Sequence, residues 1–108
     1  MNGFTFTGAS RRRYEYSRLD WEQPLNVPQQ GGILLLAKGT QQHPDPVFIA
    51  DCSNLRQRFI ETQNEAANIA QASLLYVRPE HMEQIRQAEV RDLISAYRPT
   101  PEDSAEPT

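Results

Sequence analysis

Two arginines, Arg56 and Arg58, are the side chains of this 108-residue chain best suited to binding a phosphate. They stand two positions apart in the segment NLRQR, which follows the strand-like run Val47–Ala50 and opens a predicted helix. A guanidinium carries five donors in a rigid fork that matches phosphate oxygens, and it stays protonated at neutral pH. Without other catalytic groups, Arg58 can therefore bind a phosphate, but it cannot generate a nucleophile.

The other reactive side chains lack partners for catalysis. His43 lies in a proline-rich loop and His81 near the start of a helix, and neither has a sequence-local partner at metal-ligand spacing. Ser53 is expected to be a helix N-cap, because no acid–base partner is evident. The single Cys52 excludes an internal disulfide, and we expect it to be a small buried side chain. None of the four predicts a catalytic centre.

Hydrophobic patterning predicts the elements that would position these residues. Five consecutive apolar residues, 33–37, are typical of a central strand buried on both faces, and a nine-residue polar loop follows over 38–46. The remaining predicted elements are a strand over 47–50, a helix over 53–68, a strand over 73–77 and a helix over 79–98. The order β-β-α-β-α predicts an α+β fold in which helices flank a small three-stranded antiparallel sheet.

The predicted domain spans residues 32–98, between an N-terminal leader and a C-terminal tail. The leader, residues 1–31, is rich in aromatic residues, and we expect it to pack partly on the domain. Its triplet Arg11–Arg13 is either a solvated loop or a contact for a nucleic acid or an acidic protein. The tail, residues 99–108, has the Pro, Glu and Ser content of a disordered acidic segment.

Composition and charge narrow the function classes. No apolar run approaches the roughly 20 residues that cross a bilayer, so we expect a cytoplasmic protein without a membrane partner. The net charge is −3, from 11 basic and 14 acidic residues, and three of the acids lie in the tail. Residues 1–98 are thus neutral, whereas a dedicated nucleic-acid-binding protein usually has a basic surplus.

Three segments resemble the GIY-YIG nuclease family. VPQQGGILLL (27–36) is similar to that family's lead-in and first strand, and VFIADCSNLRQRF (47–59) to its second strand and helix start. DLISAYRPTPED (92–103) is similar to its closing helix. The resemblance covers about 75 residues, and it implies a three-stranded antiparallel sheet with adjacent helices.

The resemblance also implies site positions, and most of them carry other residues here. Leu34 and Phe48 stand where the family has tyrosines, and Val90 where it has a metal-binding glutamate. Glu102 falls near the family's C-terminal asparagine, so Arg58, at the catalytic arginine, is the one functional side chain that remains. Hydrolysis of a phosphodiester needs an activated nucleophile and charge stabilisation, and Mg²⁺ prefers oxygen ligands. The substitutions therefore predict a degenerate domain without nuclease activity and without a cofactor.

Glu89 keeps an enzymatic alternative open, because it precedes Val90 and could serve as a substitute metal ligand, with Asp51 and Asp92 as weaker surface candidates. Its simpler roles are an ion pair with Arg86 or exposure to solvent. Three hypotheses follow. The chain is a non-catalytic protein-interaction module, a divergent Mg²⁺-dependent endonuclease using Glu89, or a nucleic-acid adaptor. We favour the first, with an unknown protein as its partner.

Overall fold

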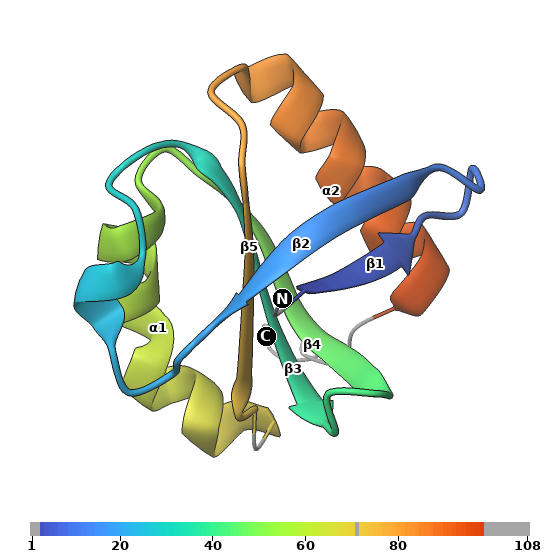
Figure 1. Ribbon diagram of the computed structural model, residues 1–108. Helices are drawn as coiled ribbons and strands as arrows, with labels where there is room; N and C mark the ends of the chain where they lie inside the picture. Colours follow the sequence, from blue (N-terminus) through green and yellow to red (C-terminus); the bar gives the residue numbers. More distant parts are fainter. Residues whose placement is uncertain (1–2, 71, 99–108) are drawn as a thin grey trace, which may run out of the picture.

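Five antiparallel strands and two helices make up the part of the chain that the computed structural model describes, residues 3–70 and 72–98 (Figure 1). The elements are β1 (Gly3–Thr7), β2 (Arg13–Leu19), the short 3-10 helix η1 (Pro24–Asn26), β3 (Gly32–Gly39), β4 (Pro44–Cys52), α1 (Leu55–Ala70), β5 (Leu74–Pro79) and α2 (Glu83–Tyr97). The strand order in the sheet is β1-β2-β5-β3-β4. The α+β class is confirmed. The predicted tail lies outside the described residues.

The prediction of a three-stranded sheet is wrong, because residues of the expected leader form two further strands. β1 and β2 form a hairpin in which Phe4 faces Tyr16 and Phe6 faces Tyr14 across the strand pair. β2 then pairs with β5, which in turn pairs with β3. The aromatic residues at every second position give this hairpin one apolar face, and that face is what the sheet buries.

The β3–β4 hairpin is longer than its sequence indicated. Only residues 40–43 separate the two strands, and Gly39 takes a φ of +95°, which a side chain would disfavour. The predicted nine-residue loop is therefore mostly strand. Pro44 and Pro46 are compatible with β4 because it is an edge strand, where not every backbone N–H is needed for pairing.

Both helices begin later than predicted. The side chain of Asn54 accepts a hydrogen bond from the backbone N–H of Gln57 at 3.1 Å, so Asn54, and not Ser53, is the N-cap of α1. Pro79 ends β5 instead of starting α2, which begins at Glu83. Neither helix in the described residues is long and apolar enough to span a bilayer.

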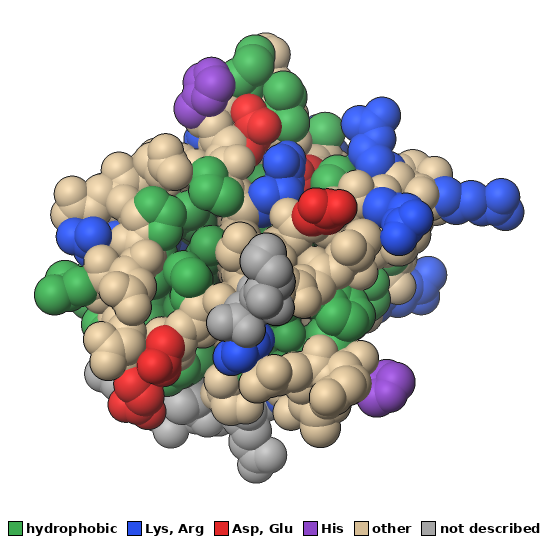
Figure 2. Space-filling view, viewed as in Figure 1, with side chains coloured by type: hydrophobic (Ala, Val, Ile, Leu, Met, Phe, Trp, Pro, Cys, Tyr) green, Lys and Arg blue, Asp and Glu red, His purple; other side chains and the backbone are tan. Residues whose placement is uncertain are grey.

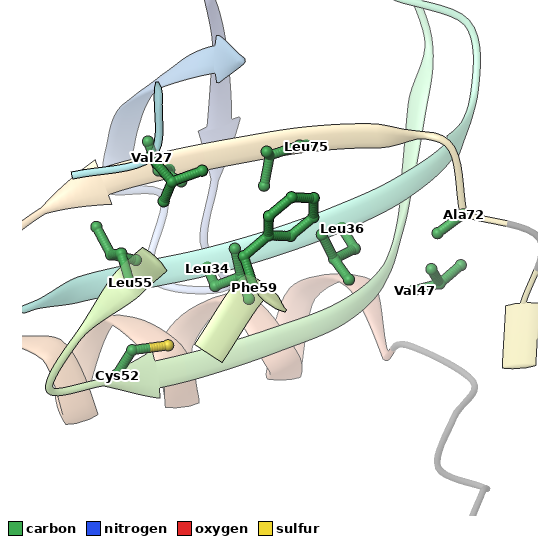
Figure 3. Close-up of a cluster of buried hydrophobic side chains, with 10 residues drawn as sticks. Val27, Leu34, Leu36, Val47, Cys52, Leu55, Phe59, Ala72 and Leu75 are labelled. Atoms are coloured by element: carbon green, nitrogen blue, oxygen red, sulfur yellow. The ribbon is translucent and has the colours of Figure 1, made fainter. Parts of the chain in front are cut away.

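The two helices pack on opposite faces of the sheet (Figure 1), so the molecule has two hydrophobic cores. On the α1 face, Phe59 and Leu55 cover Leu34 and Leu36 of β3, and all four are fully buried (Figure 3). Gly32 permits this close packing, because a Cβ there would lie 2.7 Å from the side chain of Leu55 and 2.6 Å from a backbone oxygen of β5.

The α2 face is lined by aromatic side chains. Phe6 lies at their centre, with edge-on contacts to the rings of Tyr16, Tyr76 and Tyr97 at centroid distances of 5.2 to 5.9 Å. Leu93 of α2 is buried against this cluster. Because β1 and β2 supply much of it, α2 depends on the N-terminal hairpin for its packing surface.

Candidate functional site

The structure divides the family-site positions between the two faces of the sheet. Leu34 is fully buried in the α1 core, and Phe48 packs against the same core. Val90 packs against the core on the α2 face. Glu102 lies outside the described residues. Of these positions, Leu34, Phe48 and Arg58 are on the α1 face, and Val90 is separated from them by the sheet.

Arg58 lines a polar pocket of about 300 Å³ at the start of α1. Its guanidinium carbon lies 5.6 Å from the centroid of the Phe48 ring, a cation–π geometry. Its Nε is buried without a hydrogen-bond partner among the described residues. The pocket also contains the carboxylates of Asp51 and Glu61, which oppose the binding of an anion.

Arg56, predicted to bind phosphate, makes two hydrogen bonds within the chain. Its Nε donates to the carbonyl of Val27 at 2.8 Å, and its Nη2 donates to the carbonyl of Leu25 at 3.0 Å. These bonds fasten the segment around η1 to the first turn of α1. Two of the five donors of the guanidinium thus have a structural role, and phosphate binding by Arg56 stays a prediction.

Glu89 is buried, with 2% of its surface exposed, and it neither reaches solvent nor pairs with Arg86. The hydroxyl of Tyr16 donates to its Oε2 at 2.6 Å. The guanidinium of Arg78 lies against both oxygens, with Nε 2.9 Å from each and Nη2 bonded to Oε1. Hydrogen bonding to this carboxylate is the main cause that raises the pKa of Arg78.

The expected partner of Glu89 is engaged elsewhere. Arg86 pairs with Asp51 of β4 at 2.5 Å and donates to the carbonyls of Glu80 and His81, each at 3.0 Å. It is itself buried, with 7% exposed. Each buried charge on α2 thus has a partner on the sheet, and the two acids proposed to hold a metal, Glu89 and Asp51, each bind an arginine.

Asp92, the remaining candidate, joins the turn between β1 and β2 to α2. Its carboxylate accepts hydrogen bonds from the backbone N–H and hydroxyl of Ser10, at 2.8 and 2.7 Å, and from the hydroxyl of Tyr14 at 2.8 Å. The bond from the Ser10 hydroxyl is the main cause that lowers the pKa of Asp92. Burial, with the bond to Asp92, raises the pKa of Tyr14 to about 12.

A second and larger pocket, of about 640 Å³, opens between β2, β5 and α2. Its wall includes Arg12, Arg13 and Arg78 together with Tyr14, and Glu89 is at its base. Figure 2 shows Lys and Arg side chains gathered on this side of the molecule, where the β1–β2 turn and α2 lie in Figure 1. Three arginines and two glutamates thus line this pocket.

Sequence reasoning missed this pocket. The interleaving of Tyr14 and Tyr16 with arginines permits base stacking in principle, but packing of the leader is the interpretation that the sequence favours, and Arg78 is not among the predicted site residues. The alternation Tyr14–Tyr16 beside an arginine triplet was the available signal, since residues at i and i+2 of a strand share a face. Nothing local in the sequence indicated that this strand would lie against β5 and α2.

Among the residues in 3–70 and 72–98, no three His, Cys, Asp or Glu side chains are grouped so that they could hold a metal ion. What the arrangement provides is a fixed guanidinium, the side chain of Tyr14 and two further arginines at one concave surface. Comparison with known proteins gave no match to a family model, to a curated protein or to a solved structure.

Proposed function

We propose that this chain is a non-catalytic interaction module with a GIY-YIG-like core, which binds an acidic protein partner in the cytoplasm. The observation that carries the proposal is that the carboxylate of Glu89 is already hydrogen-bonded within the chain. Its carboxylate, the substitute metal ligand of the nuclease alternative, is held by Arg78 and by Tyr16. A divalent cation would have to displace a guanidinium from a buried carboxylate, which is unfavourable because it breaks the charge-assisted hydrogen bonds that hold Glu89.

The distribution of the family positions supports the same proposal. A nuclease centre needs its nucleophile activator, its cation and its arginine around one phosphate. Arg58 lies across the sheet from Glu89 and Val90, in a pocket that contains two carboxylates. The resemblance to GIY-YIG nucleases then extends to the order of the hairpin, helix, strand and helix, and not to the chemistry.

The charge distribution supports an acidic protein over a nucleic acid. The exposed triplet Arg11–Arg13 sits on the β1–β2 turn next to the pocket that contains Arg78. Nucleic-acid binding draws on an extended basic surface, and residues 1–98 have no basic surplus. A local cluster of arginines suits a short acidic segment. The free thiol of Cys52 favours a reducing compartment and hence the cytoplasm.

A nicking assay tests the absence of hydrolysis. Supercoiled plasmid is incubated with the full chain and with Glu89→Gln, in Mg²⁺ and in Mn²⁺. We expect neither protein to exceed the protein-free rate. Nicking by the native chain that disappears in Glu89→Gln would overturn the proposal in favour of the nuclease, because glutamine keeps the shape of the side chain but is a poor metal ligand.

A binding assay tests the class of partner. Fluorescence anisotropy compares a labelled ten-residue peptide of Glu and Asp with a labelled DNA duplex of equal charge. We expect the peptide to bind more tightly. The triple variant Arg11→Gln/Arg12→Gln/Arg13→Gln should weaken peptide binding about tenfold, and the control Lys38→Gln, an exposed change at the far end of β3, should not. Tighter binding of the duplex would refute the acidic-protein partner.

A further inference from the structure

The pocket between β2, β5 and α2 contains an arginine, Arg78, whose orientation is fixed by hydrogen bonds to a buried carboxylate. Nε and Nη2 of Arg78 are bonded to Glu89, and Glu89 is held in turn by Tyr16. A charged side chain with only 1% of its surface exposed thus anchors a guanidinium that is 26% exposed. Such a buried orienting partner removes much of the rotamer entropy that an arginine otherwise loses on binding.

The donors that remain on Arg78 belong to its outer edge. With Nε and one side of Nη2 used by Glu89, the edge formed by Nη1 and the other side of Nη2 is left, and Nη1 makes no hydrogen bond to a described residue. Glu80 is the other carboxylate nearby, with an oxygen 3.8 Å from Nη2. Two parallel N–H groups at that edge match the two oxygens of a carboxylate or a phosphate.

A tyrosine ring and two further arginines lie near this edge. The ring of Tyr14 lies 6.0 Å from the guanidinium carbon of Arg78, at the outer limit of a cation–π contact. Since Arg78 and Glu89 neutralise each other, the attraction comes from Arg12 and Arg13, which line the same wall. The lining also contains Glu15, and Glu80 lies 3.8 Å from Nη2 of Arg78, so these charges cancel in sum and the binding of a single ion should be weak and sensitive to salt.

We propose that this pocket binds an oxyanion, a side-chain carboxylate or a phosphate presented by an acidic peptide, at the Nη1–Nη2 edge of Arg78. The identity of the peptide as ligand rests on the proposed function, whereas the anion site does not. Glu89 and Tyr16 are then positioning residues that act through Arg78. No bond forms or breaks in this step, and the ligand is held by charge-assisted hydrogen bonds.

Inorganic phosphate tests the site without any assumption about the partner. In ¹H–¹⁵N spectra of the full chain, phosphate should shift the amides around Tyr14, Arg78 and Glu89, and chloride at equal ionic strength should not. Arg13→Gln, an exposed change, should weaken phosphate binding about threefold, and Arg91→Gln, an exposed arginine of α2 that does not line the pocket, should leave it unchanged. Shifts confined to the surroundings of Arg58 would overturn the site.

Arg78→Lys tests whether the two-edged geometry of the guanidinium is required for binding. Lysine keeps the charge but cannot bond Glu89 and an anion along two edges, so phosphate binding should fall at least about fivefold. If this variant fails to fold, Arg13→Gln and the shift map still decide the question.

The peptide completes the test. The acidic peptide and its phosphoserine counterpart should be displaced by phosphate, and the tighter of the two identifies the anion that the pocket prefers. Phosphate binding at Arg78 without peptide binding would retain the site and refute the proposed function. Peptide binding that is insensitive to phosphate and to Arg13→Gln would retain the proposed function and refute the anion site at Arg78.

Discussion

The pair formed by Glu89 and Arg78 should show a reversal of sign in a double-mutant cycle. Arg78→Met removes the guanidinium and leaves a carboxylate that is 1% exposed with one remaining donor, the hydroxyl of Tyr16. Breaking a buried pair in this way costs about 3–5 kcal/mol of unfolding free energy. Domains of this size have roughly 5–15 kcal/mol in total, so the variant should lose more than about 10 °C in Tm.

Glu89→Gln is milder in the native background. The amide keeps an acceptor for Tyr16, and the released guanidinium of Arg78, 26% exposed, can turn to solvent. We expect a loss of about 1–2 kcal/mol. In the Arg78→Met background the same change removes an unpaired buried charge, so it should stabilise the protein by roughly 1–3 kcal/mol.

Urea unfolding of the four proteins, followed by circular dichroism at pH 7, gives the cycle. The reasoning is refuted if Glu89→Gln destabilises both backgrounds equally, because Glu89 would then be solvated or paired elsewhere. The m-values should agree among the four proteins, since a change in m would mean that the unfolded or native state has altered in compactness.

Two further predictions concern the motif and the pH dependence. Leu34→Tyr, which introduces the tyrosine that the resemblance to GIY-YIG nucleases would place there, puts a larger polar ring in a fully buried site and should cost about 1–3 kcal/mol in urea unfolding, whereas Phe48→Tyr, at a partly buried position, should cost less than about 1 kcal/mol. Equal costs would mean that position 34 is not in the core. Asp92→Asn should destabilise the protein at pH 7, because the hydrogen bonds from Ser10 and Tyr14 lower the pKa of the folded carboxyl below its ordinary 3.8. That contribution is present above the pKa of the unfolded chain and is lost as pH falls through the folded value. The difference in stability between the two proteins should therefore shrink in thermal unfolding as the pH falls below 3.8, and a difference that stays constant as the pH falls would contradict the assignment.

The sequence indicated the local elements of the domain well, because their signals are local. Five apolar residues from Ile33 to Ala37 require burial on both faces, and β3 supplies side chains to the cores on both faces of the sheet. Leu55 and Phe59 recur at the spacing of one helix face, and both lie in the α1 core. The observed start of α1 differs from the predicted one because a single side chain, the N-cap Asn54, determines it.

Local signals of this kind could not predict the number of strands in the sheet. The alternation of residues in β2 is typical of a strand with one apolar face, but it does not indicate which strand pairs with β2. The partner is β5, whose Leu75 and Val77 lie opposite Leu19 and Ser17, almost sixty residues later in the chain. The pairing is selected by the apolar side chains that the two strands bury together, Leu19, Leu75 and Val77 in the α1 core and Tyr16 and Tyr76 in the α2 core, a property of the assembled sheet.

The sequence alone determined which side chains of a GIY-YIG-like site are absent from this chain. No tyrosine stands at Leu34 or Phe48 and no carboxylate at Val90, whatever the fold. What only the tertiary structure decided is how the charged groups that are present are used. Glu89 is 73 residues from Tyr16, and Arg56 is 29 residues from the carbonyl of Val27, and in each case a long-range contact gave the side chain its role. Burial forces every charge to find a partner, and the geometry of the sheet selects which partner is within reach.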